Sequence, residues 1–454
     1  MCQYLALAVK TKRLKRVKVT HEKTAMPMFN FPRYYRLAKE GSWIVAGQIA
    51  SVLGALALVR VLTEHLDPAQ YGQLALGLTV ASLVNQVVLG GISGGIGRFY
   101  AIAAERKDLH GYLRDARLLL GYATLAVVAI GLVLMGGLHS LGYSHWMGLA
   151  AAALVFSVLS GFNSTLSGIQ NAARQRGIVA FHGGLDAWLK ILLAVGAMLW
   201  LGSTSIAVVI AYSCSSFLVT CSQLFYMRRT IPQEGTGAGG GTRFIQQMWA
   251  YSWPFSAWGI FSWMQQVSDR WALEAFATTK EVGLYAVLFQ IGYSPVAMVT
   301  GMSITFLGPI LYQRAGNAMD DARNANVHWL VWRMTFISLA ATIVGVIIAF
   351  IMHDWIFRFL VASEYREISY LLPWLLLAGG IFAAGQMLAL KLMSEMKSAK
   401  MLSAKIGSAL LGVSFNIYGA SVAGLPGVVG ALVLFSLIYL AWMILLASRA
   451  TQLK

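Results

Sequence analysis

The chain has 454 residues, of which 58% are hydrophobic and only 12% are charged. Water-soluble domains carry about a quarter charged residues, so this composition excludes a soluble protein. A net charge of +17 suggests nucleic-acid binding in a soluble chain, but here the basic residues follow the joints between apolar runs. We therefore expect a membrane protein that has no nucleic-acid partner.

The first forty residues are predicted to form a basic cytoplasmic arm. Lysine and arginine crowd the stretch Lys10–Lys18, while the apolar run Tyr4–Val9 is too short for a cleavable signal. An arm of this kind would lie on anionic lipid. The alternative is that translation starts at Met26 or Met28, which would remove the arm from the protein.

Twelve apolar stretches follow the arm. Each has about 20 residues, which is the length that a helix needs to cross a hydrocarbon core of about 30 Å. Since lipid offers no partner to unpaired backbone groups, each stretch is predicted to be a transmembrane helix. In chain order, the predicted helices are residues 41–62, 74–96, 118–138, 146–170, 181–201, 205–227, 246–273, 282–308, 327–352, 368–390, 401–420 and 425–447. The fold class is all-α.

A polar joint at residues 228–245 divides these helices six and six. It contains Pro232 and the glycine-rich run Gly235–Gly241, which is typical of a flexible linker. The chain is therefore predicted to have an N-terminal six-helix bundle, residues 41–227, and a C-terminal one, residues 246–454.

The two halves resemble each other in sequence. Arg60–Glu64 followed by Tyr71–Ala75 parallels Arg270–Glu274 followed by Val282–Ala286. Because each half has an even number of helices, both insert with the same orientation. A pseudo-two-fold axis along the membrane normal is therefore expected between the bundles, with the substrate path at their interface.

The distribution of positive charge predicts which side each end of the chain occupies. If the N-terminus is cytoplasmic, the outward joints contain only Lys280, Arg358 and Arg366, and most other basic residues face inward. The positive-inside rule then predicts that both termini are cytoplasmic.

Lys190 lies near the middle of the fifth predicted helix, with Asp186 one turn earlier. A lysine there costs about 2.5–3.5 kcal/mol on insertion scales, so it needs a partner, water or a function. One interpretation is a self-neutralising pair tolerated in the bundle interior. The other is an anion site in a central cavity.

Further charged residues lie toward the helix ends. Arg60 and Arg270 occupy matching outer positions, where they bind substrate or simply snorkel to the interface. Asp269 and Glu274 form with Arg270 either a gating charge network or an ordinary helix-end network. Two more arginines, Arg98 and Arg333, lie at cytoplasmic helix ends, where they contact incoming substrate or only follow the positive-inside rule.

Uncharged polar residues recur inside the predicted helices, and some must face the bundle interior. They are Gln48, Asn85, Gln86, Asn163, Gln265, Gln266, Gln290, Gln386 and Asn416. Gly91 and Gly95 offer a small-residue surface for close helix packing. The sequence presents no catalytic triad, paired carboxylates or metal-binding cluster, so we expect neither an enzyme nor a bound metal or cofactor.

Three short motifs carry a family resemblance. They are Leu66-Asp67-Pro68-Ala69-Gln70-Tyr71-Gly72, the stretch from Asp269-Arg270 through Glu281-Val282-Gly283-Leu284-Tyr285, and Glu364-Tyr365. In order and spacing the chain resembles the Wzx-type polysaccharide flippases of the multidrug/oligosaccharidyl-lipid/polysaccharide exporter superfamily. The resemblance covers about residues 35–450.

The resemblance implies a flippase of the bacterial inner membrane that moves undecaprenyl-pyrophosphate-linked oligosaccharide to the periplasmic leaflet for O-antigen, capsule or exopolysaccharide. It also implies two bundles that alternate around a cationic cavity, for which Lys190, Arg60 and Arg270 are the candidates. Polysaccharide polymerase and glycosyltransferases would be partners, and the membrane potential, H⁺ or Na⁺ would drive transport. The alternatives are a multidrug cation antiporter of the same superfamily and a membrane-embedded polymerase or ligase.

Overall fold

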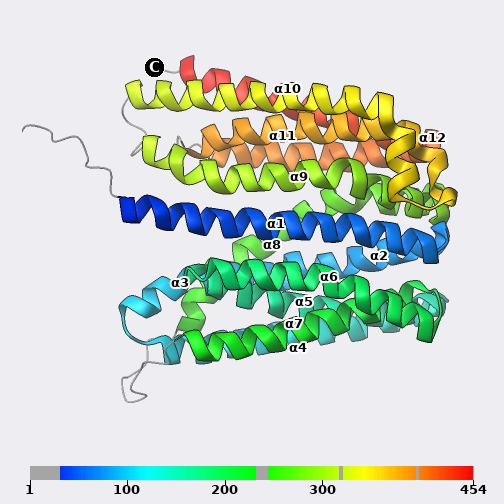
Figure 1. Ribbon diagram of the computed structural model, residues 1–454, viewed down its shortest axis with the longest axis horizontal. Helices are drawn as coiled ribbons and strands as arrows, with labels where there is room; N and C mark the ends of the chain where they lie inside the picture. The colour runs from blue at the N-terminus through cyan, green and yellow to red at the C-terminus, as the bar shows by residue number, and fades with distance from the viewer. Residues whose placement is uncertain (1–30, 232–243, 316–320, 395–397, 453–454) are drawn as a thin grey trace, which may run out of the picture.

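Helices form every long element of the computed structural model, which describes residues 31–231, 244–315, 321–394 and 398–452. Figure 1 shows these helices running roughly parallel, with both described ends of the chain at one end of the molecule. In chain order they are α1 (Phe31–His65), α2 (Pro68–Val84), the π-helical η1 (Asn85–Gly90), α3 (Gly91–Glu105), α4 (Leu109–Ser140), the short η2 (Ser144–Trp146), α5 (Met147–Ala172), α6 (Arg176–Leu201), α7 (Ser205–Thr230), α8 (Phe244–Phe276), α9 (Thr279–Ala315), α10 (Asp321–Leu360), the 3₁₀-helical η3 (Ser363–Leu371), α11 (Leu372–Ser394) and α12 (Ser398–Gln452).

Two predicted segments fall largely outside this description. Residues 1–30 of the predicted arm and residues 232–243 of the predicted linker are not among the described residues. The arm and the linker, and with them the bundle boundaries at residues 41–227 and 246–454, stay predictions.

The structure agrees with twelve membrane crossings. Ten segments of the described chain are long and apolar enough to span a bilayer. An eleventh crossing, α8, is as long but less apolar, because tryptophan, glutamine and serine recur along it. α12 is two helices joined at Ala423 and Gly424, whose backbone angles are non-helical. Glycine suits this corner because Gly424 has a positive φ of 56°.

The outer surface of the helices is apolar, as lipid requires. Leu132, Val133, Leu192 and Ile351 are each at least 68% exposed. In water such a surface would drive aggregation, whereas in a bilayer it contacts acyl chains at no cost. The chain is therefore a multi-pass membrane protein.

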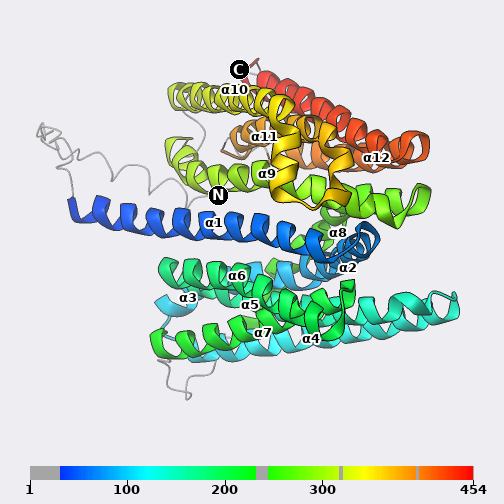
Figure 2. The ribbon, with the colours of Figure 1, turned by 45° about the vertical axis from the view of Figure 1, so that its right-hand side comes forward.

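The helices gather into two bundles, seen apart in Figure 2. In the first, α1 packs on α6 and α5 packs on α7; in the second, α11 packs between α10 and α12, and α8 packs on α12. The beginning of α8 also packs on the first bundle, since Phe244 meets the Tyr112 ring edge-on with 6.2 Å between centroids. Gly95 lies against Ser252 of α8, which confirms the expected small-residue packing surface.

The two bundles meet tightly where α2 crosses α9. A Cβ atom at Gly72 would overlap the carbonyl oxygen of Thr279, and one at Gly283 would overlap that of Pro68. Only glycine permits this approach. Gly72 and Gly283 occupy corresponding places in the two sequence repeats, so the crossing joins equivalent parts of the halves, as the pseudo-two-fold axis requires.

A π-helical segment interrupts the second crossing, which the sequence predicts as one regular helix over residues 74–96. Asn85–Gly90 forms this segment between α2 and α3. Gly259 of α8 lies against it, so that a Cβ there would be 2.6 Å from the Gln86 carbonyl oxygen. Such π-bulges are frequent at functional sites, and this one helps to place Asn85 and Gln86 on the wall of the cavity described next.

Candidate functional site

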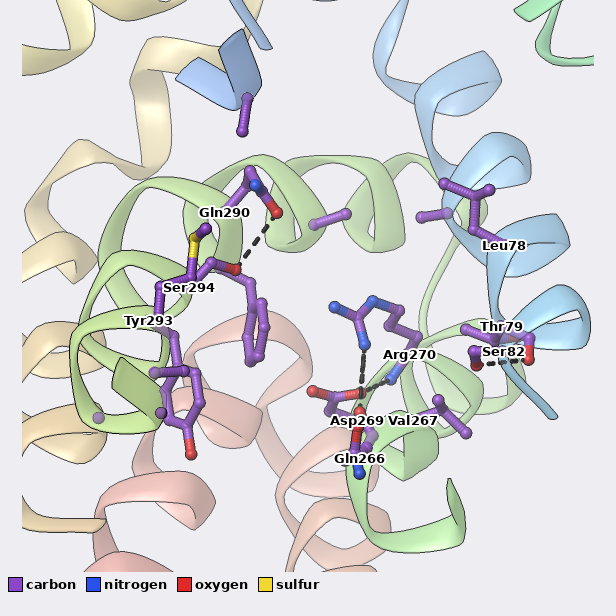
Figure 3. Close-up of a pocket in the computed structure, with 18 of the residues that line it drawn as sticks. Leu78, Thr79, Ser82, Gln266, Val267, Asp269, Arg270, Gln290, Tyr293 and Ser294 are labelled. Atoms are coloured by element: carbon purple, nitrogen blue, oxygen red, sulfur yellow. Dashed lines mark hydrogen bonds and ion pairs between the residues drawn. The ribbon is translucent and has the colours of Figure 1, made fainter. Parts of the chain in front are cut away.

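A cavity of about 1270 Å³ lies between the two bundles. The first bundle contributes lining residues from α1, α2, η1, α5, α6 and α7, and the second from α8, α9, α11 and α12. Figure 3 shows Leu78, Thr79 and Ser82 on one side of this space and Gln290, Tyr293 and Ser294 on the other. The interface between the bundles, where the sequence predicts the substrate path, is therefore hollow.

Lys190 lines the cavity from α6. Its Nζ donates to Oδ2 of Asp186 at 2.6 Å, and the two side chains are 21% and 18% exposed. The ammonium also lies 5.6 Å from the ring centre of Phe156 and 5.7 Å from that of Tyr212. Asp186 in turn accepts a hydrogen bond from Ser215 at 3.0 Å. The carboxylate and the rings together fix the position of the cation.

Arg270 lines the cavity from α8, with Asp269 beside it (Figure 3). Its Nη1 lies 3.4 Å from Oδ1 of Asp269 and donates to the Gln266 carbonyl at 3.2 Å. The guanidinium stands 4.8 Å from the ring centre of Phe289. Asp269 is more deeply buried, and its Oδ2 accepts a hydrogen bond from Tyr285 at 2.6 Å. Asp269 therefore holds the Arg270 guanidinium in place from a more deeply buried position.

The basic and acidic side chains that line the cavity are equal in number, so their formal charges cancel. Of the described residues that line it, only Lys190, Arg270, Asp186 and Asp269 are charged. Nε and Nη2 of Arg270 donate to no described residue, and Lys190 donates only to Asp186. Free donors on an ion-paired arginine and lysine suit a phosphate ligand, which accepts several charge-assisted hydrogen bonds.

The other charged residues singled out in the sequence lie away from the cavity lining. Arg60 pairs with Glu64 at the end of α1. Oε1 of Glu274 accepts a hydrogen bond from Thr279 at 2.9 Å, at the turn between α8 and α9. Arg98 and Arg333 are exposed, and Arg333 stands 5.2 Å from the ring centre of Trp329.

Most of the intramembrane amides do line the cavity. Asn85, Gln86, Gln265, Gln266 and Gln290 belong to it, together with Gln386 and Asn416. Gln48 and Asn163 do not. Two hydroxyl groups that donate to the acids, those of Ser215 and Tyr285, could not be predicted from the sequence, because a lone serine or tyrosine in an apolar helix gives no signal of its partner.

Hydrogen bonds join the two bundles at the end of the molecule opposite the described termini, which we call the outer end. Arg60 Nη1 donates to the Val361 carbonyl at 2.8 Å, and the Tyr365 hydroxyl donates to the Leu66 carbonyl at 2.8 Å. The Ala362 amide donates to the Thr63 hydroxyl at 3.2 Å. All three bonds join the first bundle to the joint between α10 and α11, so the bundles are clasped at this end.

Comparison with known proteins places the fold. A family model described as polysaccharide biosynthesis protein matches residues 37–314. No curated protein sequence matches the chain.

Several solved structures share the architecture. An inward-facing multidrug resistance MATE family transporter of the MOP superfamily aligns with a TM-score of 0.67 at 14% identity, over 88% of this chain and 94% of that chain. The lipid II flippase MurJ in an inward closed conformation aligns with a TM-score of 0.67 at 11% identity, over 90% of this chain and 87% of that chain. An outward-facing MATE family transporter aligns at 0.58 and 16% identity, over 91% and 96%.

These identities establish the fold alone, which is that of the MOP superfamily transporters. The higher TM-scores belong to the two structures described as inward.

Proposed function

The chain belongs to the family of polysaccharide biosynthesis proteins, and from this premise we propose that it is a flippase for undecaprenyl-pyrophosphate-linked oligosaccharide. It carries this lipid from the cytoplasmic to the periplasmic leaflet of a bacterial inner membrane, for O-antigen, capsule or exopolysaccharide assembly. Both termini are cytoplasmic in this proposal, so the clasped outer end faces the periplasm.

One observation carries the proposal: each bundle presents a cation with free donors to the same cavity. Lys190 comes from the first bundle and Arg270 from the second. A lipid pyrophosphate carries about two negative charges, whose desolvation in a low dielectric costs several kcal/mol per ion. Fixed ammonium and guanidinium donors replace part of that hydration, while the polyprenyl tail stays in the bilayer.

Transport requires that the contacts between the two bundles break at the outer end and form at the opposite end. The lipid head enters while the outer bonds at Val361, Ala362 and Tyr365 are intact, and it leaves after they break. An inside-negative potential favours export of each anionic charge by about 2.3 kcal/mol per 100 mV. This potential drives the cycle in our proposal, alone or with H⁺ or Na⁺.

The cavity fits an anion better than the organic cation of a multidrug antiporter. Both carboxylates of the lining are already engaged, Asp186 by Lys190 and Ser215, and Asp269 by Arg270 and Tyr285. A polymerase or ligase would need chemistry on periplasmic sugars. Such chemistry would call for a large outer segment, but the joint between α10 and α11 is short. A transport role accounts for the buried charges directly. Glycosyltransferases and a polymerase act before and after the flippase.

Transport by the purified protein in liposomes tests the proposal. Liposomes are loaded with undecaprenyl-pyrophosphate-linked oligosaccharide, and lectin accessibility reports arrival in the opposite leaflet. Lys190→Ala should abolish transport, and Lys190→Arg should retain part of it because a charge remains. Lys280→Ala is the matched control, since Lys280 pairs with Glu367 at 3.6 Å outside the cavity. Full transport by Lys190→Ala would contradict the proposal.

A further inference from the structure

The two walls of the cavity differ in how their amide side chains are used. On the wall of the first bundle, Asn85 donates to Ser160 at 2.9 Å, and Gln86 meets Gln266 across the interface at 3.4 Å. On the wall of the second bundle, the side chains of Gln265 and Gln386 make no hydrogen bond with any described residue. An amide in a membrane interior needs a partner, so these two await water or a ligand.

Aromatic rings stand beside these free amides. Phe382 lies with its ring centre 4.8 Å from that of Tyr439, and 5.8 Å from that of Phe435. Tyr293 stacks on Phe289 at 4.6 Å. All five of these rings line the cavity.

Small residues lie close against the rings. A Cβ at Gly412 would lie 3.2 Å from the Phe435 ring, and one at Gly379 would lie 3.3 Å from the Tyr293 ring. With Ala383, which also lines the cavity, they add little side-chain bulk beside the rings on this wall. Flat rings beside small residues form a shallow platform.

Tyr439 adds an unused polar group to this platform. Its side chain is buried, with 2% exposure, and its hydroxyl has no hydrogen-bond partner among the described residues. Buried hydroxyls nearly always have a partner, because leaving one unmade costs about 1–3 kcal/mol. A ligand on this wall can supply the missing partner.

The platform lies at one depth, inward of the arginine. Tyr293, Gln386 and Tyr439 each come fourteen residues after the first residue of their helices, at Thr279, Leu372 and Leu425. At 1.5 Å per residue, this is about 21 Å from the outer helix ends. Arg270 comes six residues before the end of α8 at Phe276, or about 9 Å from its outer end. The ligand that fits both has an anionic end and a long uncharged body.

We infer that this wall is a saccharide subsite that binds the glycan of the transported lipid, while Arg270 and Lys190 hold its pyrophosphate. The subsite comprises Gln265, Gln290, Tyr293, Phe382, Gln386 and Tyr439. Sugar rings present C–H faces, which pack on aromatic rings, and hydroxyls, which pair with amides. The inference rests on the proposed function and adds to it where the sugars bind.

Comparing the binding of two lipids distinguishes the saccharide subsite from the phosphate site. Binding to the purified protein in detergent is measured by native mass spectrometry, with lipid-linked oligosaccharides extracted from the organism that encodes the protein and with synthetic undecaprenyl pyrophosphate, which has no sugar. Tyr439→Phe, Gln386→Leu and Phe382→Leu should each weaken binding of the glycosylated lipid about fivefold to tenfold, the value of one lost contact. Binding of the sugar-free lipid should not change.

The controls distinguish a binding role from a structural one. Tyr418→Phe removes a hydroxyl from an exposed tyrosine of α12 and should change neither affinity. Arg270→Gln should weaken both lipids. Because the Tyr439 hydroxyl has no partner in the part of the chain that the structure describes, Tyr439→Phe should melt at or above the wild-type temperature. This variant therefore stays informative if Phe382→Leu misfolds.

Each remaining outcome has a clear reading. Wild-type protein that binds both lipids equally well, or wall variants that weaken both lipids alike or neither, would overturn the subsite and leave the flippase proposal standing. Wild-type protein that binds neither lipid would overturn the proposed function and the subsite together.

Discussion

Replacing Arg270 by alanine should lower the stability of the protein as well as transport, because it leaves the Asp269 carboxylate without its cationic partner. The Asp269 side chain is only 3% exposed, and Arg270 is its cationic partner at 3.4 Å. Removing one member of a buried ion pair typically costs about 3–5 kcal/mol, since the other charge is left uncompensated. Asp269 would keep its hydrogen bond from Tyr285, so we expect about 3 kcal/mol for Arg270→Ala.

A double variant separates the two effects. Asp269→Asn removes the orphaned charge and keeps an acceptor for the Tyr285 hydroxyl. Arg270→Ala combined with Asp269→Asn should therefore recover most of the lost stability and abundance, but no transport, because the free guanidinium donors are gone.

The assay compares three numbers for each variant: membrane abundance, melting temperature in detergent, and transport in liposomes normalised to protein. Two results would refute the reasoning. One is a single variant, Arg270→Ala, that is as stable as wild type, which would mean that Asp269 needs no cation. The other is a double variant that transports at the wild-type rate.

Two further changes test the contacts between the bundles. Arg60→Ala removes the hydrogen bond to Val361 at the outer end and should shift the population toward the outward-facing form about fivefold, as spin-label distances across that end would report; an unchanged distance distribution would mean that the clasp does not hold the bundles. Gly72→Ala places a methyl group on the Thr279 carbonyl and should lower stability by about 1–3 kcal/mol in a melting experiment. Gly121→Ala, where a methyl group meets nothing within 4 Å, is its control, and equal melting of both variants would contradict the close crossing.

The arrangement of helices could be predicted from the sequence because lipid imposes a simple rule of length and apolarity. Even α8, whose tryptophans and glutamines lower its hydropathy, is predicted as residues 246–273, because its apolar stretch is long enough to cross the bilayer. The repeat around Gly72 and Gly283 predicted the two-fold relation, and the structure shows these glycines at one crossing. No local sequence pattern predicts the π-helical turn at Asn85–Gly90, because this turn depends on the close approach of Gly259 from α8.

The candidate site could be predicted only where a charged residue lies within an otherwise apolar helix. The pairing of Asp186 with Lys190 follows from their spacing of one turn, and the structure shows that ion pair. The contact of Arg60 with Val361 joins residues 301 positions apart, and no local pattern encodes it. The same holds for the amides: seven of them converge on one cavity because of tertiary packing, which periodicity alone does not give.

The most direct test of the account is a structure of the protein determined with undecaprenyl pyrophosphate bound. The account predicts that the phosphates lie between the bundles, within hydrogen-bond distance of Lys190 Nζ and of the free Nε or Nη2 of Arg270. Phosphates bound anywhere else, with Lys190 still paired only to Asp186, would contradict it.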